Sequence, residues 1–175
     1  MLMLIPNIEF QNGMWNGKIQ LDYWSNFFES KDYIDLNIGG DLKTEKLEQI
    51  HKNGYEYVIS NQEELLNSIF NELLKEYSTM QEEYGYDEDE LEEIMPNVGQ
   101  ILDFKELIKP KRIYILNIEN DNLPYIGFHF LCSWDEEHDL GIMMNKYRII
   151  KIGGADTAFL SWIAKNDKKS FDPNK

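Results

Sequence analysis

A stripe of apolar residues in the middle of the chain restricts its fold more than any other feature. Its members recur three or four positions apart: Leu65, Leu66, Ile69, Phe70, Leu73, Leu74 and Tyr77. This spacing places them on one face of an α-helix, and that face has to be buried against another element. Ser60 and Glu63 fit a capping box at the start of the helix. The stripe therefore predicts a helix that packs on a core, and nothing in it indicates a cofactor site or a groove for a partner helix.

Short strands are expected before this helix. Apolar and polar residues alternate over residues 18–23 and again over 33–38, which is the pattern of half-buried antiparallel strands. Asn12-Gly13 and Asn16-Gly17 readily adopt the positive φ of tight hairpin turns, so one pair is expected at a turn and the other at a bulge or loop start. Three strands are predicted here.

A first helix is predicted over residues 44–52, ending near Asn53-Gly54 because this pair is a helix-stop signal. Strand patterns return in the last third of the chain. They cover residues 111–119, 125–134, 140–144 and 147–152, with turns at 121–124 and 145–146. Short turns between strands favour an antiparallel meander. Gly153-Gly154 ends it, and a short helix is expected afterwards.

The order of strands, helices and strands predicts the α+β class. We expect an antiparallel β-sheet, made from the N-terminal strands plus the C-terminal meander, with a central pair of helices packed on one face. A chain of 175 residues is long enough for one domain with its own core. The expected organisation is one domain over residues 1–165, an acidic insert at 82–99, and a polar tail at 166–175.

The charge balance restricts the partners of the chain. Lysine and arginine number 17 against 32 acids, which gives a net charge of −15. Such a surface repels phosphate groups, so nucleic acids and anionic membranes are not expected to bind. A basic protein partner and simple solubility both remain open. The first six residues lack a basic segment, and no apolar run approaches the roughly 18 residues of a membrane span, so a cytoplasmic location is expected.

The single cysteine, Cys132, excludes an intrachain disulfide and a cysteine-rich metal site. Because it lies in a predicted strand, we interpret it as a buried thiol and not as a nucleophile. Gly153-Gly154 lacks the G-x-G-x-x-G spacing of a dinucleotide site. No cofactor is therefore predicted.

Acidic residues without an intervening cation occupy much of residues 82–93. They are Glu82, Glu83, Asp87, Glu88, Asp89, Glu90, Glu92 and Glu93. Mutual repulsion opposes a helix here, although residues 87–90 can begin a short one because anions suit a helix N-terminus. The glycine and ligand spacing of an EF-hand are missing, so calcium is not favoured. The six acids from Asp87 to Glu93 are the candidate surface for a basic partner.

The segment from Trp134 to Gly141 contains four acids and His138, which could be a ligand, a proton carrier or a loop organiser. As a catalytic pair, His138 and Glu137 would provide acid-base or metal-assisted chemistry. Zinc ligands normally come from separated elements or from i, i+4 positions on a helix, and neither pattern is present, so no metal is predicted. The favoured interpretation is structural: Trp134 is buried, Asp135 caps the turn, His138 bridges the loop, and Gly141 permits close backbone approach.

These residues form a W-x-x-E-H-x-x-G pattern, followed by G-x-A-D-x-x-F from Gly153 through Asp156 to Phe159. In this region the chain resembles an uncharacterised bacterial domain family. The resemblance is close over residues 125–160 and loose before them. It implies a shared fold and no known activity. Compact acidic domains related to it often act as immunity proteins against bacterial toxins, an analogy of fold that says nothing about a site.

Two functional hypotheses follow from the sequence. The first is a non-catalytic, immunity-like interaction domain whose acidic surface binds a basic protein such as a toxin. The second is a metal-assisted hydrolase or lyase centred on the His138 loop. A purely structural loop, with the working surface elsewhere, is a third possibility. The oligomeric state is not predicted.

Overall fold

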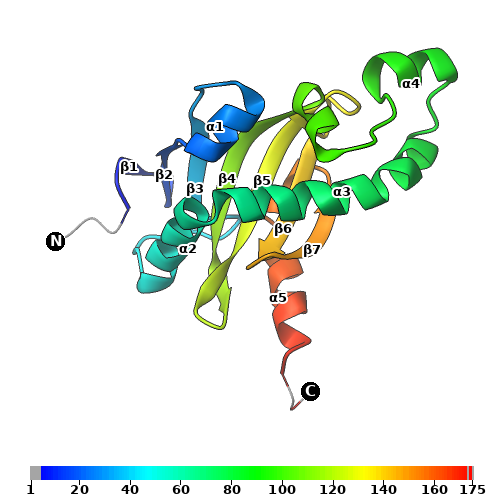
Figure 1. The fold of residues 1–175 in the computed structure, drawn as a ribbon. Helices are drawn as coiled ribbons and strands as arrows, with labels where there is room; N and C mark the ends of the chain where they lie inside the picture. Colours follow the sequence, from blue (N-terminus) through cyan, green and yellow to red (C-terminus); the bar gives the residue numbers. More distant parts are fainter. Residues whose placement is uncertain (1–4, 173, 175) are drawn as a thin grey trace.

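A computed structural model describes residues 5–172 and 174 of the chain. Its centre is one seven-stranded sheet whose strands lie in chain order (Figure 1). The strands are β1 (Ile8–Gln11), β2 (Met14–Ile19), β3 (Ile34–Gly39), β4 (Ile108–Asn120), β5 (Leu123–Cys132), β6 (Leu140–Asn145) and β7 (Arg148–Gly153). The predicted α+β class and the antiparallel C-terminal meander are confirmed.

The expectation of a wholly antiparallel sheet is wrong at one place, because β3 and β4 are parallel. Parallel neighbours need a long crossover, and the chain between these strands provides one through several helices. They are α2 (Gln49–Ser60), α3 (Gln62–Tyr84), α4 (Glu88–Ile94) and the 3-10 helix η1 (Ile101–Glu106). Helix α3 runs across the sheet (Figure 1).

The N-terminal predictions need two corrections. The three strands are present, but the one expected to continue to residue 23 ends at Ile19, and α1 (Asp22–Phe28) follows. Asn12-Gly13 forms the predicted hairpin turn, with φ of 54° and 80°. Gly17 is neither a bulge nor a loop start, because it is paired within β2. A Cβ there would lie 2.7 Å from the Asn7 carbonyl oxygen, so glycine permits close approach of the neighbouring chain.

The predicted helix over residues 44–52 is also displaced, because α2 begins at Gln49 and continues to Ser60. Gly54 lies inside it and does not end it. A Cβ on Gly54 would lie 2.5 Å from Pro124 Cγ, so this glycine lets α2 approach β5 closely. Ser60 is the last residue of α2, and α3 has no side-chain cap hydrogen bond, so the predicted capping box does not form. The apolar stripe of α3 is buried as predicted, except that Leu74 is only partly buried.

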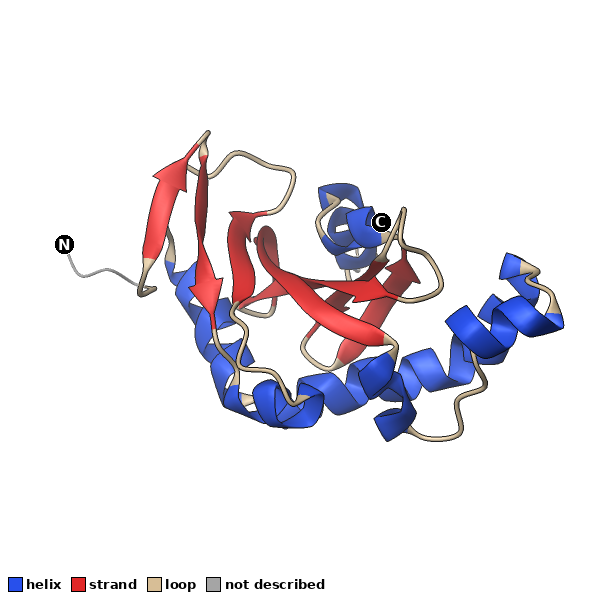
Figure 2. Cartoon of the chain, turned by 90° about the horizontal axis from the view of Figure 1, so that it is seen from above, coloured by secondary structure: helices blue, strands red, loops and turns tan. Residues whose placement is uncertain are grey.

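Helices cover both faces of the sheet, which corrects the expectation of one covered face (Figure 2). One core lies under α1, α2 and α3, and its large members include Trp24, Phe70, Phe104, Phe128, Phe130 and Trp134. The second core lies under η2 (Ala155–Ala158) and α5 (Ser161–Lys169), and it contains Tyr114, Leu116, Tyr125, Met143 and Ile163. Every residue of β6 is buried. A strand that is apolar on both sides needs cover on both faces.

The segment predicted as a polar tail from residue 166 is helical through Lys169. Asp167 holds it to the sheet, because it accepts hydrogen bonds from both terminal nitrogens of Arg148, at 2.7 and 2.6 Å, and from the Tyr125 hydroxyl at 2.6 Å. The outermost parts of the domain and tail predictions, residues 1–4, 173 and 175, lie outside the described residues. Among the helices described, none combines the length and the apolar character needed to cross a membrane.

Candidate functional site

The acidic insert forms a helical projection, which we call the acidic arm and define as residues 85–94. Helix α3 ends at Tyr84 and is followed by Gly85, whose φ is 66°, and α4 turns back beyond the β7 side of the sheet (Figure 1). Asp87 caps α4: its Oδ1 accepts from the Glu90 amide at 2.9 Å, and the Asp87 amide donates to Glu90 Oε2 at 3.0 Å. The sequence left a short helix beginning at these acids open, and the capping box explains why it forms despite the repulsion.

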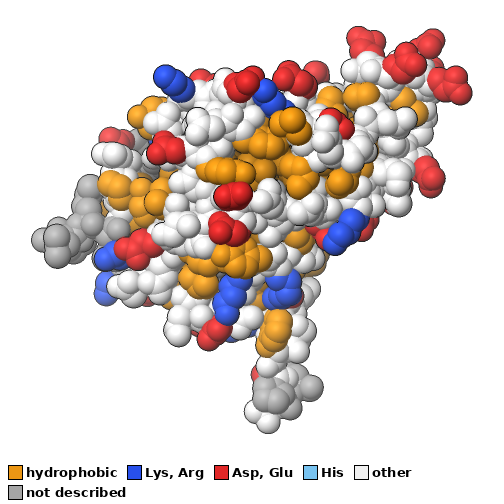
Figure 3. Space-filling model, viewed as in Figure 1, with side chains coloured by type: hydrophobic (Ala, Val, Ile, Leu, Met, Phe, Trp, Pro, Cys, Tyr) orange, Lys and Arg blue, Asp and Glu red, His pale blue; other side chains and the backbone are white. Residues whose placement is uncertain are grey.

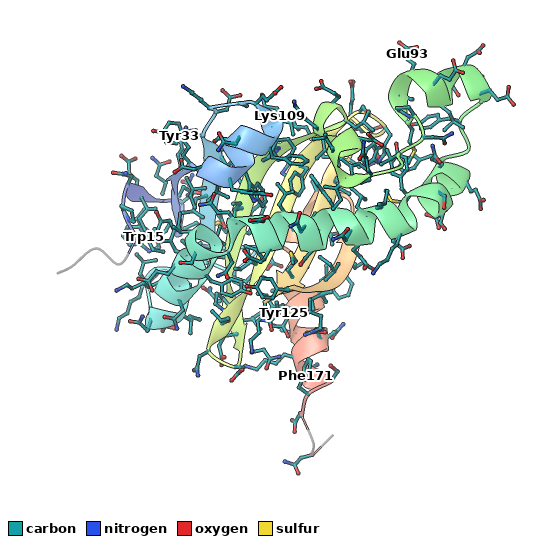
Figure 4. The ribbon with its side chains drawn as sticks, viewed as in Figure 1. Trp15, Tyr33, Glu93, Lys109, Tyr125 and Phe171 are labelled. Atoms are coloured by element: carbon teal, nitrogen blue, oxygen red, sulfur yellow. The ribbon has the colours of Figure 1, made fainter. Side chains whose placement is uncertain are left out.

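The candidate partner-binding acids all lie on the surface of this arm. Asp87, Glu88, Asp89, Glu90, Glu92 and Glu93 are all exposed. Within residues 5–172 and 174, no lysine or arginine forms an ion pair with any of them. Figure 3 shows acidic side chains gathered over the region of α4 without a neighbouring cation on the face in view, and Figure 4 shows Glu93 pointing away from the domain. The arm therefore presents a concentrated negative charge to solvent.

Two tyrosines fix the arm to the loop that follows β5. Tyr84 and Tyr86 stack with ring centroids 5.8 Å apart. The Tyr84 hydroxyl donates to Asp135 Oδ2 at 2.7 Å, and the Tyr86 hydroxyl donates to the Trp134 carbonyl at 2.7 Å. Ser133 adds a bond of 2.6 Å from its hydroxyl to the Ile94 carbonyl. The structure thus brings together the two segments that the sequence singled out.

Asp135 is the centre of the Trp134–Gly141 loop. Its Oδ1 accepts from the backbone amide of His138 at 3.0 Å and lies 3.0 Å from Nδ1 of the same residue. The His138 side chain is 68% exposed, so the ring lies on the surface and not in a pocket. Trp134 is buried and packs edge-on against Tyr77 at 5.5 Å. Glu137 is exposed.

The two sequence patterns contact each other through their backbones. The Ala155 amide donates to the His138 carbonyl at 2.8 Å. A Cβ on Gly141 would lie 2.1 Å from the Gly154 carbonyl oxygen, so only glycine fits there. Asp156 is exposed, and its charge helps to raise the pKa of His138. This packing accounts for the glycine of the first pattern without reference to catalysis.

The pKa of His138 provides a test of this loop. The hydrogen bond to Asp135 and the charge of that carboxylate raise the His138 pKa above its ordinary 6.5. Burial raises the Asp135 pKa, but hydrogen bonds from Tyr84 and His138 outweigh it and leave that pKa below the ordinary 3.8. We expect an NMR titration to give a His138 pKa above 6.5, and Asp135→Asn to lower that pKa because it removes the carboxylate charge beside the ring.

The directions of these two pKa shifts determine how the stability of the protein depends on pH. The His138 contribution is present below its unfolded-state pKa and is lost as pH rises through the raised folded value. The Asp135 contribution to stability is present above the unfolded-state pKa of Asp135 and is lost as pH falls through its lowered folded-state pKa.

For the His138 titration, Glu137→Gln is the control, since Glu137 has only a minor influence on the His138 pKa. An Asp135→Asn variant with an unchanged His138 titration would contradict this account.

A groove that sequence reasoning missed lies between α3 and β7. Its volume is about 470 Å³. The acids Glu72, Glu76, Glu83 and Asp139 line it together with apolar residues that include Met80 and Ile152. The available signal was the recurrence of glutamate at positions 72, 76 and 83, which lie along one edge of the apolar stripe of the helix.

A second cavity, of about 410 Å³, lies between α1 and the adjoining ends of β4 and β5. Both of its lysines are paired, Lys105 with Glu29 and Lys109 with Asp32. Cys132 also lines it, and burial raises the pKa of this thiol to about 12. A thiol with such a pKa is a poor nucleophile at neutral pH, in agreement with the interpretation from sequence.

No group of three or more histidine, cysteine, aspartate or glutamate side chains within the described part of the chain is placed to hold a metal ion. Sequence reasoning did not find the His129–Asp139 pair, in which Nε2 and Oδ2 lie 2.8 Å apart. It also missed that His51 is buried, with Nε2 2.7 Å from Asn117 Oδ1; burial lowers the pKa of His51. The described residues therefore offer no set of metal ligands in support of the hydrolase or lyase hypothesis.

The fold and this surface define an α+β domain with a mostly antiparallel sheet and a fixed acidic projection. The chain belongs to the family described as Domain of unknown function (DUF6985), whose model matches residues 5–160. No curated protein and no solved structure matches the chain.

Proposed function

We propose that this chain is a non-catalytic interaction domain that binds a basic protein partner through the acidic arm. The observation that carries the proposal is the fixed geometry of the arm. Asp87 and five acidic residues of α4 have exposed carboxylates, and none of these forms an ion pair with a lysine or arginine of the described residues. Tyr84 and Tyr86 hold this helix against the body of the domain. A flexible acidic segment would serve solubility equally well, whereas a fixed one presents its charges in a defined pattern.

The finer form of the proposal is an immunity-like protein of the bacterial cytoplasm whose partner is a basic toxin. It is supported by the net charge of −15 and by the resemblance noted in the sequence. Complementary charge mainly accelerates the encounter of two proteins and selects between partners. Binding of this kind weakens as salt shortens the range of the charges.

The test is capture of partner proteins from a lysate of the source cells, with the chain as bait, at about 50 mM and about 500 mM salt. We expect a basic protein that is retained only at low salt. The variant Glu88→Gln, Glu92→Gln, Glu93→Gln should retain it about tenfold less well, because it removes three arm charges and leaves the Asp87–Glu90 cap intact.

The matched control is Glu9→Gln, Glu45→Gln, Glu106→Gln, which removes three exposed charges outside the arm. It should bind the partner within about twofold of the natural chain. An equal loss of partner retention in the two variants would mean that binding depends on the net charge of the chain and not on the arm. Failure to capture any salt-sensitive basic protein would refute the proposal itself.

A further inference from the structure

We infer that an extended segment of the basic partner adds to β7 as an eighth strand and occupies the groove between β7 and α3. This inference rests on the proposed function and specifies how the partner binds. It starts from the position of β7 at the end of the sheet, where no described strand pairs with its outer side. An edge strand leaves alternate amide and carbonyl groups free to pair with another chain. Six residues offer an edge about 20 Å long.

The groove is negatively charged on the side of α3. Glu72, Glu76 and Glu83 line it from the helix. Glu72 is paired with Lys75, at 3.0 Å. Glu76 and Glu83 are exposed, and neither forms an ion pair within the described residues. A strand added to β7 would direct every second side chain towards this wall, where lysine or arginine would be favoured.

The face of β7 that lies towards α5 favours different residues in the added strand. Lys151 is among the residues that line the groove, but its ammonium lies 5.0 Å from the centre of the Trp162 ring. Arg148 binds Asp167, so the charged groups of both β7 cations are directed towards α5. Trp162 is 49% exposed. Basic side chains pointing this way would meet like charge, whereas apolar ones would cover the aromatic ring. The preferred segment therefore alternates basic and apolar residues.

A second copy of the chain is a poorer occupant of the same edge. Pairing two β7 strands across a two-fold axis would bring the glutamates of both α3 helices into one groove. Like charges brought into one groove oppose association, and the net charge of −15 on each copy adds to that repulsion. Charge complementarity thus selects a basic partner.

The experiment measures amide hydrogen exchange of the full chain by NMR, with a capped eight-residue peptide of alternating lysine and valine as the probe. We expect alternate amides of residues 148–153 to exchange about tenfold more slowly, and those of β1, the other edge strand, to change by less than about twofold. A peptide with four lysines followed by four valines should protect them less. The alternating peptide with every backbone nitrogen methylated, which blocks both of its edges, should not protect them at all.

Two charge-matched variants separate the groove from general electrostatics. Glu76→Lys with Glu83→Lys should weaken peptide binding about tenfold, whereas Glu88→Lys with Glu92→Lys should weaken it less than about threefold. If the peptide binds but alters only the arm, or if the methylated peptide protects β7 equally, the eighth strand is refuted while the proposed function stands. Protection of β7 that rises with protein concentration without peptide would identify a second copy as the occupant and overturn the inference.

Discussion

Replacing Trp24 by alanine is expected to lower the free energy of unfolding by about 3–5 kcal/mol, a large part of what a domain of this size possesses. Trp24 is 2% exposed. It stacks on Phe130 with ring centroids 5.9 Å apart and lies 5.5 Å from Phe128, so its removal leaves a cavity between α1 and β5. It also removes the 2.8 Å hydrogen bond from Nε1 to the Gln62 carbonyl.

The measurement is a urea unfolding midpoint for the variant and for a matched control. Trp162→Ala deletes the same side chain at a position that is 49% exposed, and it should cost less than about 1 kcal/mol. Trp24→Phe keeps an aromatic ring in the core, so its unfolding midpoint should lie between those of Trp24→Ala and Trp162→Ala. Similar midpoints for Trp24→Ala and Trp162→Ala would show that α1 contributes little to the core.

The parts of the fold that were predicted are those with a long, regular pattern. The stripe over residues 65–77 has one spacing throughout, and the C-terminal strands are separated by short turns such as Asp121-Asn122. Helix α1 was missed because Ile19, Leu21 and Tyr23 continue the strand alternation across the point where the chain turns. Gly54 was misinterpreted because its role is contact with Pro124, which is distant in sequence. Local patterns carry no information on such contacts.

The parallel pairing of β3 and β4 could have been predicted. The helical connection from residue 39 to 108 is long enough for a crossover, whereas a hairpin needs only a few residues. For the site, sequence reasoning found the acidic residues and the His138 loop separately. Their contact depends on Tyr84 and Tyr86, and tyrosines at a helix end are compatible with many partners. The groove along β7 depends on strand order, which the chain does not reveal locally.

The second large effect is expected at Gly127, which lies in the middle of β5. A Cβ built there would lie 1.5 Å from the Ala158 carbonyl oxygen. The backbone of residue 127 fixes the position of this Cβ, and the atom that it meets is a backbone oxygen, so no rotation of a side chain relieves the contact. Gly127→Ala must push η2 away from the sheet, and the buried Ala158 and Thr157 lie on η2. We expect the free energy of unfolding to fall by about 3 kcal/mol, the upper range for overpacking of a core.

The loss should also be confined mainly to one face of the sheet. Displacement of η2 loosens the core that contains Tyr125 and Ile163, so amides of α5 should exchange faster than in the natural chain while those of α3 change little. Gly99→Ala is the control, since the nearest atom to its Cβ, Asp103 Oδ2, is 3.8 Å away and the change should cost less than about 0.5 kcal/mol. Faster exchange to the same extent in α3 and α5 would mean that the two cores unfold as one unit. Equal stability of the two glycine variants would show that the close approach of η2 to β5 is not required by the fold.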